Sequence, residues 1–152
     1  AGRLAWRGLR LRAPPVSADA PHQWPIAMPD VFSIRHTTVE DFVEPIVHEV
    51  KVRRADLLAD LRREGKRAAY QGLASQCWYV LAAGIGQTDD VPADCGVLIA
   101  HAQHFELARP APRRAMRLPL ATWMALARAT AEAAPDDDGQ AWLGDPGADP
   151  PP

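Results

Sequence analysis

Two short apolar runs within the first 53 residues of the chain predict β-strands. The first run spans roughly Ile26 to His36, and the second spans Pro45 to Arg53. Side chains alternate between the two faces of a strand, so Val47, Glu49 and Lys51 are expected on one face of the second strand. The pattern therefore sets an acidic and a basic side chain next to each other within an otherwise apolar strand.

The short loop between the two runs predicts an antiparallel hairpin. A turn centred just after Val39 would place Asp30 directly opposite Glu49, where Cβ atoms lie about 4.5–5.5 Å apart. Two carboxylates that close repel unless a cation lies between them, and an oxygen-rich site suits Mg²⁺ or Mn²⁺. The sequence therefore predicts a metal site at these two residues with Lys51 beside it. The alternative is an edge strand with a solvated face, on which Glu49 and Lys51 form an ordinary ion pair.

The remaining periodic segments predict an α/β domain. The arginine-rich start of the chain is interpreted as a helix remnant running into a strand. We expect helices over 55–63 and, after a break at Gly65, over 66–76. We expect strands over 77–82, 96–101 and 105–109, and a closing helix over 119–131. This order predicts a sandwich of one mixed β-sheet flanked by helices.

Charge and composition divide the chain in two. Residues 1–134 hold all 17 Lys and Arg but only 14 of the 19 acidic residues, so a single basic domain is expected there. Residues 135–152 are acidic and rich in Pro and Gly, which predicts a disordered tail. No apolar stretch approaches the roughly 20 residues of a membrane span. Cys77 and Cys95 are expected to be buried reduced thiols, which favours a cytoplasmic location.

These features resemble the PD-(D/E)XK nuclease superfamily, and most closely the MmcB-like DNA-repair nuclease group. The resemblance runs from Pro25 to about Arg117. The residues that carry it are Pro29-Asp30, His48-Glu49-Val50-Lys51-Val52, Ala59-Asp60, Lys66, Tyr70, the strand from Cys77 to Ala82, and Val91-Pro92 leading into Gly96-Val97-Leu98-Ile99.

The resemblance implies a restriction-endonuclease-like sheet and a metal-dependent DNA nuclease that serves DNA repair. Asp30, Glu49 and Val50 would hold Mg²⁺ or Mn²⁺, and Lys51 would assist the hydrolytic water. This sequence departs from the superfamily pattern in one respect. Many members carry a Glu on an early helix. Asp19 is the only acidic residue before Asp30 here, so the first helix is truncated or that ligand is missing.

Basic residues after the second strand are candidates for binding DNA phosphates. The set is Arg53, Arg54, Arg62, Arg63, Lys66, Arg67 and Tyr70, with Gln71 as a further polar candidate. Arg113, Arg114 and Arg117 would extend this basic surface. Lys66 and Tyr70 are four residues apart and would share one helix face. For any single arginine, an ordinary solvated charge is the alternative.

Two other functions remain open on the sequence. One is a catalytically inactive nucleic-acid-binding module with the same fold, which the missing early Glu favours. The other is a nuclease of a defence or mobile-element system. DNA is the expected partner in each case, no membrane is expected, and both a monomer and a homodimer are compatible with the sequence.

Overall fold

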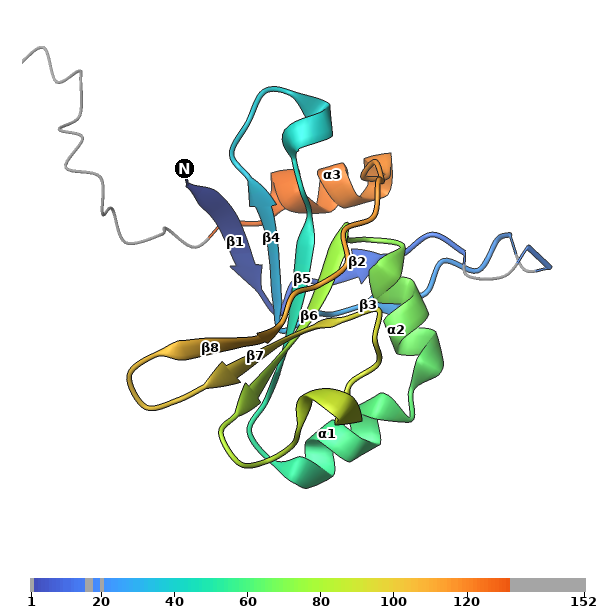
Figure 1. Ribbon diagram of the computed structural model, residues 1–152. Coiled ribbons are helices and arrows are strands. Elements are labelled where there is room, and N and C mark those ends of the chain that lie inside the picture. The colour runs from blue at the N-terminus through green and yellow to red at the C-terminus, as the bar shows by residue number, and fades with distance from the viewer. Residues whose placement is uncertain (1, 16–17, 20, 132–152) are drawn as a thin grey trace, which may run out of the picture.

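The architecture is one mixed β-sheet flanked by helices, as predicted from the order of elements. The computed structural model describes residues 2–15, 18–19 and 21–131 (Figure 1). The predicted acidic tail lies outside these residues. In spatial order the sheet contains β1 (Arg3–Arg7), β4 (Val31–Arg35), β5 (Ile46–Lys51), β6 (Gln76–Ala82), β7 (Gly96–Ala100) and β8 (Phe105–Arg109).

The centre of the sheet is parallel and its margins are antiparallel. β5, β6 and β7 run parallel, whereas β1, β4 and β8 join antiparallel. A parallel neighbour needs a crossover, and between β5 and β6 it consists of α1 (Arg54–Leu61) and α2 (Glu64–Gln71). Figure 1 shows both helices, in green, next to these central strands.

Smaller elements complete the layer on the buried side of the sheet. A two-stranded sheet pairs β2 (Leu11–Arg12) with β3 (Ile26–Ala27), and it contacts α3 (Leu120–Arg128) as well as α2. Single 3₁₀ turns occur at η1 (Glu40–Phe42) and η2 (Thr88–Asp90).

The face of β5 that carries Val47 and Glu49 is the buried face. Across the register, Val47 lies opposite Phe32 of β4 and Cys77 of β6, and all three side chains are buried. On the other face of β5, Val50 remains 43% exposed. The predicted alternation is therefore confirmed, and the charged pair points into the layer that the helices cover.

The predicted strand from Ile26 to His36 is wrong as one element. Ile26–Ala27 pairs with β2 as β3, and a separate strand, β4, begins at Val31. Pro29 lies between them and has no N–H to donate, so it interrupts a ladder.

The expected helix remnant at the start of the chain is also wrong. Residues 3–7 form β1, and Trp6 pairs with Phe32 while Leu4 pairs with Ile34. The period of two in Leu4 and Trp6, with Trp6 buried, suits an edge strand better than a helix.

The helix predicted over 66–76 ends earlier, at Gln71, and it begins at Glu64. Gly65 therefore lies inside the first turn of α2. The break between the two helices falls between Leu61 and Glu64 instead of at Gly65. Leu73 and Ala74 are fully buried, and the Ser75 amide donates to the Pro45 carbonyl at 2.8 Å. The chain leaves the helix there because these residues pack into the core and align β6 with β5.

Candidate functional site

The hairpin between β4 and β5 has the register that the sequence predicted. Val31 pairs with His48, and Phe32 pairs with Val47. Asp30 immediately precedes β4, so the same register brings it level with Glu49. Its Oδ2 accepts a hydrogen bond from the Val50 amide at 2.8 Å. This hydrogen bond therefore holds Asp30 next to the end of β5, which carries Glu49 and Lys51.

Glu49 is buried, with only 2% of its surface exposed. Tyr70 donates its hydroxyl to Glu49 Oε1 at 2.6 Å. Lys51 and Lys66 both donate to Oε2, each at 2.8 Å. Because β5 is flanked by β4 and β6, the alternative of a solvated edge strand is wrong. Glu49 and Lys51 do form an ion pair, but they form it inside the protein.

A second buried carboxylate, Asp60 of α1, faces the same group. Lys66 Nζ donates to Asp60 Oδ1 at 2.5 Å, and the Tyr79 hydroxyl donates to Oδ2 at 2.8 Å. Lys51 Nζ lies 3.6 Å from Oδ1. We call this group the buried ion cluster, and its members are Glu49, Lys51, Asp60 and Lys66 with the hydroxyls of Tyr70 and Tyr79.

Four of the six residues of this cluster were predicted as site residues from the sequence, namely Glu49, Lys51, Lys66 and Tyr70. The expectation that Lys66 and Tyr70 share one face of a helix is confirmed, since both reach Glu49 from α2. Asp60 had no role assigned, and Tyr79 was not noticed. The available signal for Tyr79 was the crossover, because a parallel β6 next to β5 brings Tyr79 level with Glu49.

Burial and hydrogen bonding act against each other on the two carboxylates. Burial alone raises the pKa of Glu49, but hydrogen bonds from Lys51, Lys66 and Tyr70 outweigh it and hold the pKa below its ordinary value. Burial likewise raises the pKa of Asp60, and hydrogen bonds from Lys66 and Tyr79 lower it further than burial raises it. Both acids are therefore ionised at neutral pH.

The same contacts act in the opposite direction on the partners. Burial lowers the pKa of Lys66, yet Asp60 and Glu49 raise it above its ordinary value. Burial and the hydrogen bond to Glu49 raise the pKa of Tyr70. The negative charges of two carboxylates in the cluster are thus matched by the positive charges of two lysines. The neutral hydroxyls of Tyr70 and Tyr79 donate hydrogen bonds to the carboxylates.

The oxygen donors suit a hard divalent cation, but the lysines already supply the positive charge. Carboxylates of Asp30, Glu49 and Asp60 are ligands that Mg²⁺ and Mn²⁺ prefer. Among the described residues, no three or more His, Cys, Asp or Glu side chains converge as a metal-binding group. Lys66 bridges two of the acids, so its ammonium stands in for a cation. The carboxylate oxygens are therefore of the type that such a metal prefers, and the Lys66 ammonium would have to leave Glu49 for a metal to bind there.

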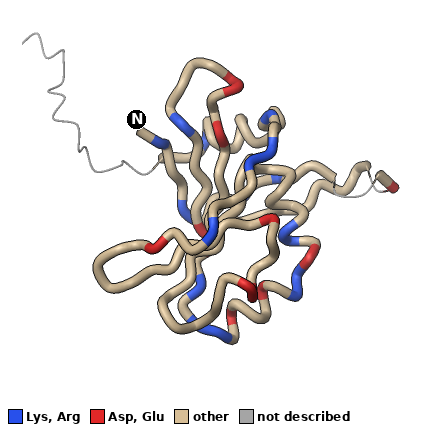
Figure 2. Tube along the Cα trace, viewed as in Figure 1, with Lys and Arg blue, Asp and Glu red and all other residues tan. Residues whose placement is uncertain are grey.

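The expected phosphate-binding residues surround the crossover helices. Figure 2 shows basic residues along α1 and α2. Arg53, Arg62 and Arg63 are exposed. Arg54 pairs with Asp90 at 3.2 Å. Arg67 is half-buried on α2. These positions leave several basic side chains accessible to a polyanion.

Other polar candidates are engaged elsewhere. Gln71 donates a hydrogen bond to Asp94 and does not join the buried ion cluster. Arg113 pairs with Glu44 at 2.8 Å, and Arg114 donates to the Ala74 carbonyl at 3.3 Å. Arg117 lies 3.4 Å from Glu40. The expected extension of the basic surface is therefore largely neutralised by acidic neighbours.

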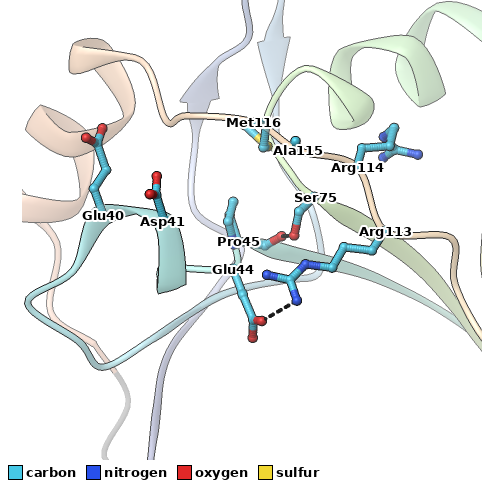
Figure 3. A pocket seen from close by; sticks show the side chains of 9 residues that line it. All are labelled: Glu40, Asp41, Glu44, Pro45, Ser75, Arg113, Arg114, Ala115 and Met116. Carbon is cyan, nitrogen blue, oxygen red and sulfur yellow. Dashed lines mark hydrogen bonds and ion pairs between the residues drawn. The ribbon is translucent and has the colours of Figure 1, made fainter.

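The structure also contains a cavity of about 400 Å³ away from Glu49. Figure 3 shows Arg113 pointing toward Glu44 there, and Pro45 and Ser75 also line the cavity. Pro45 precedes β5, so the cavity opens at the start of that strand. Glu49 lies four residues further along, about 13 Å at the rise of a β-strand. The cavity and the buried ion cluster are separate sites.

Two further expectations concern the cysteines and the membrane. Cys77 and Cys95 are buried and form no disulfide, as expected for reduced thiols. Burial raises the pKa of Cys95 to about 12. None of the described helices is both long enough and apolar enough to cross a bilayer.

Comparison with known proteins supports the fold alone. No protein-family model matches the chain, and no curated protein matches it. A similar solved structure is that of the SPO1766 protein of unknown function from Silicibacter pomeroyi. The two chains are 22% identical with a TM-score of 0.53, and the match covers 83% of this chain and 70% of that one. At this identity, the likeness indicates a common arrangement of the backbone.

Proposed function

We propose that this protein is a metal-dependent nuclease that hydrolyses phosphodiester bonds in DNA and serves DNA repair. The observation that carries the proposal is the buried carboxylate of Glu49, held beside Lys51 and level with Asp30 at the end of a central strand. These are the residues on which the resemblance to PD-(D/E)XK nucleases rests.

The energetic cost of the cluster supports a functional role. Taking charges out of water costs several kcal/mol per ion, and well-packed apolar residues often replace buried ion pairs at no loss of stability. Here Glu49 and Asp60 are 2% and 7% exposed, and two lysines accompany them. Charged groups concentrated in this way are more typical of active sites than of ordinary cores.

The proposed roles follow from the contacts. Asp30, Glu49 and Val50 would hold the metal, and Tyr70 fixes the orientation of the Glu49 carboxylate through its 2.6 Å hydrogen bond. A bound Mg²⁺ or Mn²⁺ would supply an activated water and offset charge on the phosphate. Lys51 would donate a hydrogen bond to that water or to a phosphate oxygen on which negative charge develops. Arg53, Arg62 and Arg63 bind neighbouring phosphates.

One observation favours the second candidate, a non-catalytic nucleic-acid-binding module. Both oxygens of Glu49 already accept hydrogen bonds from Lys51, Lys66 and Tyr70. In such a module the cluster would remain closed, and the exposed arginines would bind nucleic acid without cleavage. Catalysis and binding must therefore be measured separately.

The deciding experiment incubates purified protein with single-stranded, duplex and branched DNA, with Mg²⁺, with Mn²⁺ and with a chelator. We expect cleavage of at least one substrate with metal and none with chelator. Glu49→Gln should abolish it, whereas the exposed carboxylate variant Asp89→Asn should cleave normally. DNA binding without cleavage under every condition would favour the inactive module.

A further inference from the structure

Lys66 connects the two buried carboxylates. Its Nζ lies 2.8 Å from Glu49 Oε2 and 2.5 Å from Asp60 Oδ1. The two acid oxygens therefore lie no further apart than the sum of these distances. Only 28% of the Lys66 side chain is exposed, so water supplies little of the solvation that its ammonium requires. The lysine is held between the acids by charge-assisted hydrogen bonds.

A divalent cation at Glu49 would compete with Lys66 for Oε2, since Oε1 already accepts the Tyr70 hydroxyl. Lys51 binds the same oxygen, but it lies on β5, two residues from Glu49. Lys66 differs because it extends from α2 and hydrogen-bonds Asp60 Oδ1 at 2.5 Å, whereas Lys51 Nζ lies 3.6 Å from that oxygen. It can leave Glu49 while keeping Asp60, and so it avoids becoming an unpaired buried charge, which is strongly destabilising.

Asp60 is itself well placed to keep Lys66. Its other oxygen accepts the Tyr79 hydroxyl at 2.8 Å, and it is 7% exposed within α1. The carboxylate is therefore fixed in position and stays close to Lys66 whichever contact that lysine makes with Glu49. Without Asp60, Lys66 would have Glu49 as its remaining acidic partner in the cluster.

We propose that Lys66 is an internal counter-ion that competes with the divalent metal for Glu49, and that Asp60 is the acceptor that retains Lys66 when metal binds. The inference rests on the proposed function in one respect, namely that Glu49 is a metal ligand. It adds that the affinity of the site is set by an ammonium group of this chain. Asp60 is a positioning residue in this scheme.

The test is calorimetric titration of the full chain with Mn²⁺ alone, without DNA, at fixed ionic strength. Lys66→Met removes the competing ammonium and should tighten Mn²⁺ binding by about tenfold or more, the scale of one competing charge-assisted hydrogen bond. Lys66→Gln should also tighten it, while Lys66→Arg should not. Asp60→Asn should weaken Mn²⁺ binding, because Lys66 would then have Glu49 as its one acidic partner in the cluster and would compete more strongly with the metal.

Controls separate this effect from general changes in charge or fold. Arg113→Met removes one cation beside Glu44, at the other end of β5, and should leave Mn²⁺ affinity within about twofold of wild type, since distant exposed charges are screened. Circular dichroism and thermal unfolding check each variant. If Lys66→Met fails to fold, Lys66→Gln carries the test, because it keeps a hydrogen-bond donor for Asp60.

The possible outcomes are distinguishable. Unchanged or weaker Mn²⁺ binding in folded Lys66→Met or Lys66→Gln would overturn the inference, and so would no binding by any variant. Tighter binding in these variants supports it even if the protein cleaves no DNA, in which case the proposed function fails alone. If wild type shows metal-dependent cleavage but the Lys66 variants bind Mn²⁺ no more tightly than wild type, the proposed function stands and the counter-ion role of Lys66 is refuted.

Discussion

At the scale of single residues, neighbouring positions on β5 occupy opposite environments. Glu49 faces the helices and is held ionised by hydrogen bonds from three neighbours, Lys51, Lys66 and Tyr70. His48 faces the other side of the strand and stacks against Trp78 with ring centroids 6.4 Å apart. Its Nδ1 is buried without a hydrogen-bond partner among the described residues. Burial, followed by the charge of Arg3, lowers the pKa of His48 to about 4.

This shift predicts a stability change in a defined pH window. The folded-state pKa of about 4 lies below the ordinary value of 6.5, so the stability that neutral His48 contributes is complete above pH 6.5. It is lost as pH falls from 6.5 toward 4. The free energy of unfolding should decrease by about 3 kcal/mol across this window, at 1.36 kcal/mol per unit.

Denaturant unfolding between pH 4 and pH 7 measures this change. His48→Gln should flatten the profile, whereas His36→Gln, at an exposed histidine, should keep it. A profile unchanged by His48→Gln would assign the pH dependence to other groups. Glu49 and Asp60 contribute little to this change over most of the window, because their stabilisation is lost as pH falls from the ordinary carboxylate values of 4.5 and 3.8 toward their lowered folded-state pKa values.

At the scale of elements, α1 positions Asp60 by packing one leucine into the core. Leu57 is fully buried, whereas Leu58 next to it is 38% exposed. Leu57→Ala should lower the free energy of unfolding by about 2–5 kcal/mol, the usual cost of removing a buried leucine side chain. Leu58→Ala should cost under about 1 kcal/mol. Urea unfolding compares the two, and equal losses would contradict this packing of α1.

The elements also show how far the sequence could predict the fold. The hairpin register followed from alternation and loop length, because a shift of one residue would expose Val47 and bury Val50. The division at Pro29 was missed because both flanking segments are apolar. The end of α2 was missed because Leu73 and Ala74 are compatible with a helix, and only their contacts with the core end it. Asp60 could not be assigned because its partners lie on α2 and β6.

At the scale of the whole molecule, basic residues lie along α1 and α2, whereas Arg113 and Arg117 are paired with acids. If DNA binds across α1 and α2, its affinity should decrease steeply with salt. Each phosphate contact contributes about 0.9 to the slope of log affinity against log salt. Arg62→Ala with Arg63→Ala should therefore lower the magnitude of the slope by about 1–2.

Fluorescence anisotropy at several salt concentrations measures the slope, and Arg113→Ala is the matched control. Its guanidinium is paired with Glu44 at 2.8 Å, so removing it should leave the slope unchanged. An equal effect of both sets of substitutions would place the DNA elsewhere on the molecule.

The most direct test of the central claim is single-turnover cleavage of DNA at saturating protein with Mg²⁺, for wild type, Lys51→Ala and Glu49→Gln. We predict that wild type cleaves, that Glu49→Gln does not, and that Lys51→Ala cleaves about 10²-fold more slowly or worse. DNA affinity at fixed salt should change little in both variants, because exposed arginines supply the phosphate contacts. Normal cleavage by Lys51→Ala at saturation, or metal-dependent cleavage by folded Glu49→Gln, would contradict the account.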